Sequence, residues 1–308
     1  MSRQRWDEIL LSNLALTTAD RPAISSVPRL APRRNYDVRD VNALLADAVR
    51  RRVFPGAVWA VGDASGIWDI DSTGLLDPDR GNMSTPTQID TLFDVASMSK
   101  ILATWSAIGV LWEQRRLNLR ASLGSYWPET TQHPIGELTA HHLLTHTAGL
   151  PLRAQLKPLY GTDLGNVRRG ILAEPLHRTP GQAVEYTDRA AMILGFLAEY
   201  LTGERLDTQA ARVWRSLGLR LTQYGPMPAW ARTECAPTEL DPKAGQRPRG
   251  TVHDYSGRLL GPSCGSAGVF SDTLDVSRFL RYLLGAEPHL AHPGFGQRWV
   301  RESLQVHT

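Results

Sequence analysis

Cysteine, lysine and long apolar runs are all scarce in this chain of 308 residues. The two cysteines, Cys235 and Cys264, cannot form a disulfide framework, and no Cys-x-x-Cys pair is present for zinc binding or thiol redox chemistry. We expect both to be small buried residues of a reducing compartment. No run approaches 18 apolar residues, and the N-terminal segment lacks a clear apolar core followed by a small-residue cleavage site. We therefore expect a cytoplasmic protein with neither a membrane span nor a secretory signal.

The charges of the chain are nearly balanced. The 34 basic and 31 acidic residues give a net charge of +3, which is too small to indicate a nucleic-acid partner despite a pI near 9.0. Hydrophobic residues make up 42% of the chain, enough to bury a core. Only Lys100, Lys157 and Lys243 are lysines, so a lysine inside a catalytic motif is a more specific signal here than usual.

The chain is expected to fall into four segments. Residues 1–36 are rich in proline, arginine and serine and are expected to form a flexible N-terminal arm. Residues 37–118 are expected to be an α/β part, residues 119–285 a mainly helical region, and residues 286–308 a short C-terminal tail. The fold class predicted from this order is α/β plus an all-helical region.

Hydrophobic periodicity places the main elements within these segments. It predicts helices over residues 37–52, 139–146, 188–201 and 273–284, and a hairpin with a buried first strand over residues 57–70. A further helix over residues 97–115 is apolar nearly all round, which predicts a central, buried position.

The first candidate for chemistry is Ser-x-x-Lys at Ser97 and Lys100. Residues three apart share one face of a helix, so their side chains can come within hydrogen-bond distance. Burial disfavours a charged ammonium, so a buried Lys100 could accept the proton of Ser97 and make it a nucleophile. The alternative is a surface lysine after a capping serine, and the apolar helix around it argues against that alternative.

The second candidate is Glu-Tyr-Thr-Asp at residues 185–188, which follows a Pro-Gly turn and precedes a helix. Tyr186 could project into a cleft as a proton shuttle, or could simply be packed. Asp188 is interpreted first as a helix N-cap. No metal or other cofactor is expected: His142 and His146 have ligand spacing on a helix, but a third ligand is lacking, so structural hydrogen bonds are favoured.

A Ser-His-Asp triad is a further alternative. His253 and Asp254 could supply two of its members, but no Gly-x-Ser-x-Gly elbow accompanies them.

Together these segments resemble the serine β-lactamase-related hydrolases of the class C β-lactamase, penicillin-binding protein and esterase type. The Ser-x-x-Lys signature is typical of β-lactamases and penicillin-binding proteins. The resemblance covers about residues 38–285, in the order of the family. It is carried by Phe-Pro-Gly-Ala-Val from residue 54, Thr-Leu-Phe-Asp-Val-Ala-Ser-Met-Ser-Lys at 91–100, Leu-Leu-Thr-His-Thr-Ala-Gly-Leu-Pro at 143–151, Pro-Gly-Gln-Ala-Val-Glu-Tyr-Thr-Asp at 180–188 and Gly-Ser-Ala-Gly-Val-Phe-Ser at 265–271.

The resemblance implies a β-lactamase/transpeptidase-like fold and an acyl-enzyme mechanism. Ser97 would attack the carbonyl of a small ester or amide, Lys100 would take its proton, and Tyr186 would pass a proton to the leaving group. Asp188 stands where many lactamases have a substrate-contacting asparagine, and the resemblance makes it a substrate-binding residue. Because aspartate is common there in esterase-like members, a serine hydrolase of esterase or amidase type, or an acyltransferase, is expected.

One part of the family pattern is not found. The third motif, a His/Lys-Thr/Ser-Gly strand, should follow residues 273–284, but only 23 residues follow residue 285. That is too few for three strands of about five residues each, their turns and a helix. The formal match at residues 292–294 contains Pro293, which cannot donate to a sheet ladder. The C-terminal part of the antiparallel sheet therefore looks missing, which predicts self-association through an open sheet edge. It also leaves a second hypothesis, a catalytically weak or inactive truncated protein.

Overall fold

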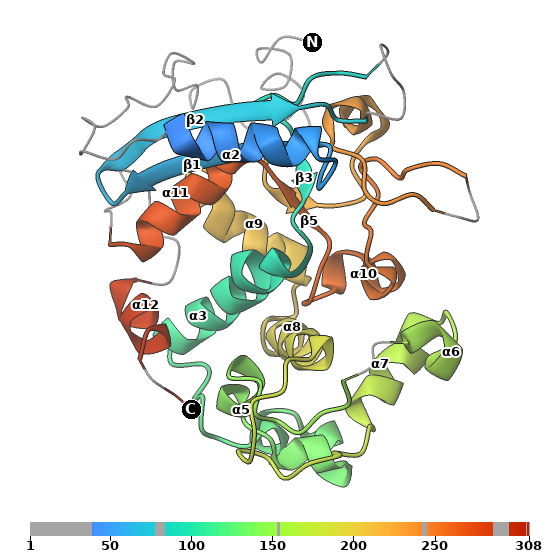
Figure 1. Cartoon of the computed structure of the whole chain (residues 1–308). Coiled ribbons are helices and arrows are strands. Elements are labelled where there is room, and N and C mark those ends of the chain that lie inside the picture. Colours follow the sequence, from blue (N-terminus) through green and yellow to red (C-terminus); the bar gives the residue numbers. More distant parts are fainter. Residues whose placement is uncertain are drawn as a thin grey trace, which may run out of the picture.

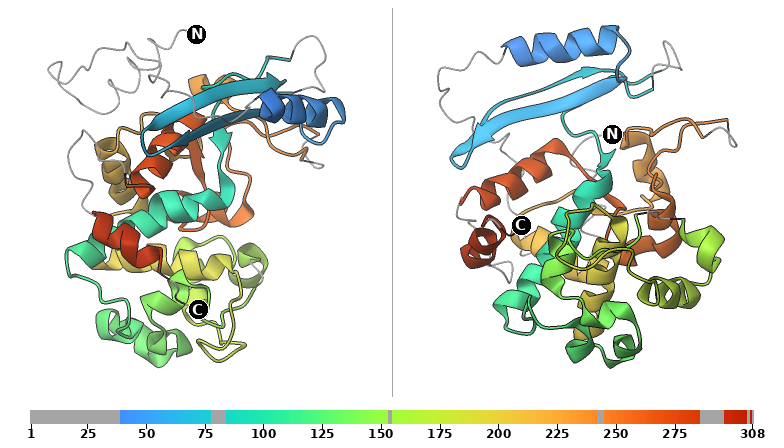
Figure 2. Two further views of the ribbon diagram at one scale, coloured as in Figure 1. Left: turned by 60° about the vertical axis from the view of Figure 1, so that its left-hand side comes forward. Right: turned by 60° about the horizontal axis from the view of Figure 1, so that its bottom comes forward.

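The computed structural model describes residues 39–77, 84–152, 155–241, 245–285, 296–305 and 307. An antiparallel hairpin lies at one end of the molecule, apart from most of the helices (Figures 1 and 2). Its strands are β1 (Gly56–Asp63) and β2 (Gly66–Gly74), which pair from end to end with one register shift between Val61 and Gly62. The helix α2 (Arg39–Arg50) packs on β2, and α11 (Thr273–Leu283) packs on β1. The predicted hairpin is confirmed, but most residues of β1 are only half-buried, because β1 pairs with β2 alone among the described residues.

A second, smaller antiparallel sheet lies deeper in the molecule. It has the order β3-β5-β4, with β3 (Phe93–Asp94), β5 (Val269–Ser271) and β4 (Gln223–Tyr224). All three residues of β5 are buried. Since β3 ends just before Ser97, this sheet fixes the start of the segment that carries the Ser-x-x-Lys motif.

The expected single helix over residues 97–115 is instead a series of three helical types. A 3₁₀ turn, η3 (Ala96–Met98), leads into a π-helix, η4 (Lys100–Trp105), and then into the α-helix α3 (Ser106–Glu113). Short π segments inside helices occur frequently at functional sites. The expected complete burial is wrong for the first turns: Met98 and Ile101 are about half exposed, because this end of the helix reaches the surface beside Ser97.

Helices are the main regular elements of the rest of the described chain, as predicted. The other helices are α4 (Leu123–Tyr126), η5 (Pro128–Gln132), η6 (Pro134–Glu137), α5 (Ala140–Leu144), α6 (Leu156–Tyr160), α7 (Leu164–Leu172), α8 (Asp188–Thr202), α9 (Leu206–Ser216), η7 (Ala229–Glu234), α10 (Tyr255–Leu260), η8 (Gly261–Ser263) and α12 (Gln297–Ser303).

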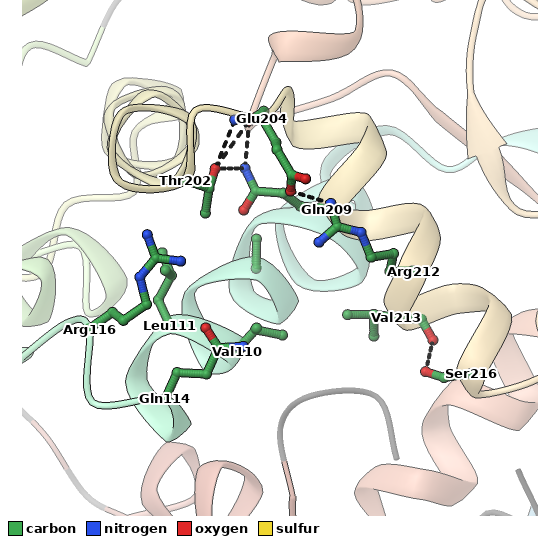
Figure 3. A pocket seen from close by; sticks show the side chains of 11 residues that line it. Val110, Leu111, Gln114, Arg116, Thr202, Glu204, Gln209, Arg212, Val213 and Ser216 are labelled. Carbon is green, nitrogen blue, oxygen red and sulfur yellow. Dashed lines mark hydrogen bonds and ion pairs between the residues drawn. The ribbon is translucent and has the colours of Figure 1, made fainter. Parts of the chain in front are cut away.

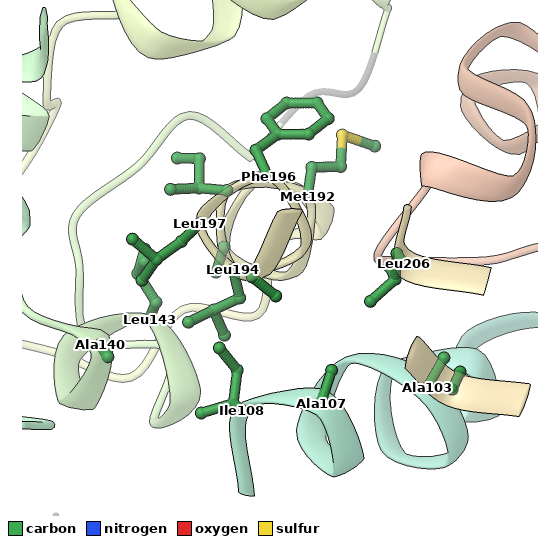
Figure 4. Close-up of a cluster of buried hydrophobic side chains, with 14 of the residues drawn as sticks. Ala103, Ala107, Ile108, Ala140, Leu143, Met192, Leu194, Phe196, Leu197 and Leu206 are labelled. Atoms are coloured by element: carbon green, nitrogen blue, oxygen red, sulfur yellow. The ribbon is translucent and has the colours of Figure 1, made fainter. Parts of the chain in front are cut away.

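The helix α8 is the centre of the main core. Ten consecutive residues, from Arg189 to Ala198, are buried, because neighbouring helices surround α8. Figure 4 shows its side chains pointing in several directions, toward residues of α3 and α5 among others. The helix ends at Gly203, whose φ of 73° lies in the left-handed region that favours glycine. The predicted start and end of this helix are confirmed to within one residue.

Part of the expected C-terminal tail is folded. Trp299 of α12 is buried, and its ring lies 5.4 Å from that of Trp105 and 5.5 Å from that of Trp112. A Cβ atom at Gly109 would lie 2.4 Å from the Trp299 ring, so α3 approaches α12 closely at a position without a side chain. The expected arm at residues 1–36 and the formal match at residues 292–294 lie outside the described residues.

Both cysteines are buried, as predicted. Burial raises the pKa of the Cys235 thiol to about 12 and also raises that of Cys264, so both thiols stay protonated and unreactive at neutral pH. Within the part of the chain that the structure describes, no helix is both long and apolar enough to cross a bilayer.

Candidate active site

Ser97 lies exposed in the 3₁₀ turn between β3 and the π-helix. The residue before it, Ala96, has a φ of 47°, a left-handed conformation that is unusual for a residue with a side chain. Such a conformation costs on the order of 1–3 kcal/mol and is found preferentially at functional sites. Asp94 holds the turn in place, because its Oδ1 accepts the Ala96 N–H at 2.9 Å. The chain is thus fixed just ahead of Ser97, while the hydroxyl stays accessible.

Lys100 lies beneath Ser97 and is buried, with 8% of its surface exposed. Its Nζ lies 2.8 Å from Ser97 Oγ, 3.1 Å from the Ser266 carbonyl oxygen and 2.7 Å from Asp188 Oδ1. Ser97 lies in η3 and Lys100 begins η4, and side chains three residues apart lie on one side of a helical chain. The buried amine therefore touches the hydroxyl that it was predicted to activate.

Tyr186 approaches Ser97 from the other side. Its hydroxyl donates to Ser97 Oγ at 2.8 Å, and Lys100 Nζ lies 4.9 Å from the centre of its ring. The residue precedes α8, as predicted, and is 57% exposed, so the phenol borders on solvent. The structure therefore brings together the three predicted catalytic side chains, from positions 97, 100 and 186.

Asp188 does not cap α8, contrary to the first interpretation of its sequence position. The N-cap is Thr187, whose Oγ1 accepts the Arg189 N–H at 3.2 Å and donates to the Pro151 carbonyl at 2.8 Å. Asp188 is instead the first residue of the helix, and its carboxylate pairs with Lys100. A carboxylate is also favourable in the first turn of a helix because of the helix dipole.

The segment around Ser266 supplies the back of the site. Gly265 lies so close to α8 that a Cβ atom there would be 2.0 Å from the Ala191 carbonyl oxygen. Its own carbonyl accepts the Thr104 hydroxyl at 2.7 Å. The neighbouring Ser266 carbonyl can therefore reach Lys100. The sequence pattern at residues 265–271 resembles a loop of the family, but it did not predict a role for the Ser266 carbonyl.

His146 is a neighbour of the site that sequence reasoning missed. Its ring lies 4.7 Å from that of Tyr186. The predicted helix over 139–146 ends at Leu144, and His146 follows in a left-handed conformation with φ of 56°. Burial, and then the positive charge of Lys100, lower the pKa of His146, while Asp188 acts in the opposite direction. The apolar pattern of residues 139–146 did not indicate that His146 lies beside Tyr186.

The histidines and aspartate of the alternative metal and triad motifs make structural contacts instead. His142 Nδ1 accepts the Thr139 N–H at 3.3 Å in a capping box of α5. Because α5 ends at Leu144, His146 lies outside the helix and does not share a helix face with His142. Asp254 caps α10, accepting the Gly257 N–H at 2.6 Å. Among the described residues, no group of three or more potential ligands could hold a metal ion.

A separate cavity of about 450 Å³ lies between α3, α9 and the end of α8 (Figure 3). Two of the side chains that line it are charged arginines with protein partners: Arg116 donates to the Leu201 carbonyl, and Arg212 pairs with Glu204. None of the predicted site residues lines this cavity, so it is distinct from the candidate active site.

Comparisons with known proteins identify the family of the chain. The family model described as Beta-lactamase matches residues 41–306. An Escherichia coli (strain K12) protein named "Putative D-alanyl-D-alanine carboxypeptidase" is 30% identical over 223 residues, covering 63% of this chain and 51% of the relative. The chain thus spans about half the length of that curated relative.

Solved structures show the same fold. The D-alanine carboxypeptidase AmpC from Burkholderia cenocepacia superposes with a TM-score of 0.67 at 25% identity, over 85% of this chain and 68% of the other. A class C beta lactamase from Rhodobacter sphaeroides, at 24% identity, superposes with a TM-score of 0.68 over 84% of this chain and 68% of the other. The predicted β-lactamase/transpeptidase-like fold is confirmed. The chain belongs to the β-lactamase family of serine hydrolases.

Proposed function

We propose that this chain hydrolyses a small ester or amide, or transfers its acyl group, through an acyl-enzyme on Ser97. The observation that carries the proposal is the pair of contacts at Ser97 Oγ, which lies 2.8 Å from both Lys100 Nζ and the Tyr186 hydroxyl. A nucleophile within reach of a base, and a base held by a third group, is the arrangement that activates a serine.

The surroundings of Lys100 suit the role of base. Lys100 can act as a base only in its neutral form, which has two N–H donors and one lone pair. The Ser266 carbonyl and the Asp188 carboxylate can only accept hydrogen bonds, so the two N–H groups would point at them. The lone pair would then face the Ser97 hydroxyl, the one contact of the three that has a proton to give.

The reaction then proceeds in two balanced steps. The Ser97 oxygen bonds to the substrate carbonyl carbon as its proton moves to Lys100, and the bond to the leaving group breaks as Tyr186 delivers a proton to that group. In the second step, water or another acceptor attacks the acyl-serine and gives its proton to Lys100. Lys100 returns this proton to Ser97 Oγ as the acyl–serine bond breaks, which releases the acid or the transferred product and regenerates Ser97. Tyr186 regains its proton from Lys100 between the steps.

The substrate class follows from two observations. Aspartate at position 188 resembles the esterase-like members of the family, which favours esters. The names of the relatives are the specific reason for a second candidate, a D-alanyl amide or a β-lactam amide. Turnover of an aryl acetate, a D-Ala-D-Ala peptide and a chromogenic cephalosporin, measured side by side, separates these substrate classes.

The nucleophile is tested by intact mass spectrometry after incubation with a fluorophosphonate. We expect the wild-type chain to gain the mass of one phosphonyl adduct and Ser97→Ala to gain none. Ser65→Ala is the matched control, because Ser65 is an exposed serine in the hairpin turn and its loss should leave labelling unchanged. An adduct on Ser97→Ala at the wild-type rate would rule out Ser97 as the nucleophile.

The alternative proposal is a catalytically weak member of the family. It rests on the arrangement of strands, since no strand follows β5 within the described residues. In the family, the third-motif strand supplies one oxyanion donor, and losing one such donor costs about 10²–10³-fold in kcat. Labelling of Ser97 that is specific but slow, with little turnover of all three substrates, would favour this alternative.

We also propose self-association through β1, whose outer edge has no partner strand among the described residues. Unpaired strand edges are templates for pairing with another chain. We expect sedimentation velocity to show species larger than the monomer that grow with concentration. Amide hydrogen exchange in β1 should slow as they form, and exchange in β5, which is already paired on both sides, should not. A monomer at every concentration would contradict this expectation.

A further inference from the structure

His146 contacts three consecutive residues of the segment that carries Tyr186. Its carbonyl oxygen accepts the Glu185 N–H at 2.8 Å, and its Nδ1 accepts the Thr187 N–H at 3.4 Å. Between these two bonds, its ring packs on the Tyr186 ring at 4.7 Å and an angle of 41°. His146 thus holds the backbone N–H groups of the residues before and after the tyrosine.

The chemistry of this contact requires a neutral imidazole. Because Nδ1 accepts the Thr187 N–H, the hydrogen-bond pattern assigns the ring proton to Nε2. Protonation of Nδ1 would turn that acceptor into a donor facing another donor. Burial and the Lys100 charge lower the pKa of His146 below its ordinary value of 6.5, so the neutral form prevails at pH 7.

The charged and titratable groups around His146 come from two elements and the loop before α8. Lys100 of η4 opposes a positive imidazole, and Asp188 of α8 favours one. Tyr186 lies against the ring itself. The Glu185 carboxylate is engaged elsewhere, with His177 Nε2 at 2.9 Å and Arg178 Nε at 3.0 Å. Protonating His146 would therefore break one hydrogen bond to the tyrosine segment and add a positive charge near Lys100.

We propose that His146 is a positioning residue: its neutral imidazole holds Tyr186 against Ser97, and its protonation releases the tyrosine and lowers acylation. This inference rests on the proposed acyl-enzyme on Ser97 and adds a pH-sensitive element to that site. It assigns to His146 an action through Tyr186, not a contact with substrate.

The test compares two substitutions at position 146 over a pH range from 5 to 8. Asparagine can retain an acceptor near the position of Nδ1 and tolerates the left-handed conformation, but does not titrate. We expect His146→Ala to lower the rate of fluorophosphonate labelling about 10–100-fold, the order of loss caused by small misplacements of catalytic groups. We expect His146→Asn to recover much of that rate and to lack the fall in rate that the wild type shows below pH 6.5.

His142→Asn is the matched control. His142 lies on the same loop-and-helix unit and its pKa is also lowered by burial, but its Nδ1 bonds Thr139 and not the tyrosine segment. This variant should keep both the rate and the acid limb of the wild type. A circular dichroism melt of each variant excludes loss of folding as the cause of any change.

A second readout keeps the inference separate from the proposed function. In the wild-type protein, the Thr187 amide resonance should titrate together with the His146 ring, and in His146→Asn it should not titrate in that range. If the wild type is never labelled, the acyl-enzyme proposal fails while this titration still decides whether the contact is pH-sensitive. The inference is overturned if Thr187 does not titrate with His146, or if His146→Ala reacts at the wild-type rate with its acid limb intact.

Discussion

Replacing Lys100 with arginine is expected to reduce the rate of Ser97 acylation by about 10²–10⁴-fold, the usual contribution of a general base. Arginine matches the charge of the protonated lysine and could still reach Ser97, Ser266 and Asp188, but a guanidinium does not lose its proton in a protein. It therefore cannot accept the proton of Ser97. The measurement is the second-order rate of fluorophosphonate labelling, followed by intact mass, for wild-type and Lys100→Arg protein.

Lys157→Arg is the matched control for this prediction. Lys157 is an exposed lysine on α6 without a contact to Ser97 among the described interactions, so the same chemical change there should leave the rate unaltered. Because an arginine in a buried site can also disturb packing, both variants should be shown to melt at temperatures close to that of the wild type. Labelling of Lys100→Arg at the wild-type rate would exclude Lys100 as the base.

The local parts of the site could be predicted from sequence because they depend on spacing along one helix. Ser97 and Lys100 are three residues apart, and that separation brings side chains together on one side of a helix. Here it does so across the passage from the 3₁₀ turn η3 to the π-helix η4. The position of Tyr186 ahead of a helix followed from the Pro-Gly turn and the apolar period after it. These statements required no knowledge of the tertiary structure.

The contact between Tyr186 and Ser97 could not be predicted in this way, since 89 positions separate them. It arises because η4 and α8 pack against each other, and only the resemblance to the family suggested it. The N-cap was misassigned because Thr187 and Asp188 are adjacent and both residue types cap helices well. The place of His146 depends on one left-handed residue after α5, which hydrophobic periodicity does not reveal.

The burial of β1 was overestimated for a related reason. The apolar sequence of a strand shows which side chains could be buried. It does not show how many helices or strands of the fold will cover them. Among the described residues, β1 pairs with β2 alone and packs against α11, so its apolar side chains stay half-buried. The expected burial of the first turns of the nucleophile helix was wrong at Ile101 for the same kind of reason, since that side chain is 46% exposed.

A buried ion pair behind the active site carries the largest expected effect on stability. Arg189 of α8 is 1% exposed and Glu174 is 6% exposed, and Arg189 Nε lies 2.9 and 2.7 Å from the two carboxylate oxygens. Tyr160 of α6 donates to the same carboxylate at 2.6 Å. Burial, and then the bond to Glu174, raise the pKa of Tyr160 to about 12, so it remains a donor throughout the neutral range. This network ties α6 and the segment after α7 to the helix that begins at Asp188.

Removing one member of this pair is expected to be costly, because it leaves a charge buried without its partner. Arg189→Met should lower the free energy of unfolding by about 3–5 kcal/mol, measured by urea denaturation at pH 7. The double variant Arg189→Met with Glu174→Leu should recover a large part of this loss, since replacing both ions by apolar side chains removes the unpaired charge. The exposed pair of Arg205 and Asp207 is the control, and Arg205→Met should cost no more than about 1 kcal/mol. Equal losses for Arg189→Met and Arg205→Met would show that the buried pair does not hold α6 and α8 together. The start of α8 and the tyrosine before it would then owe their position to other contacts, such as those of Thr187, Asp188 and His146.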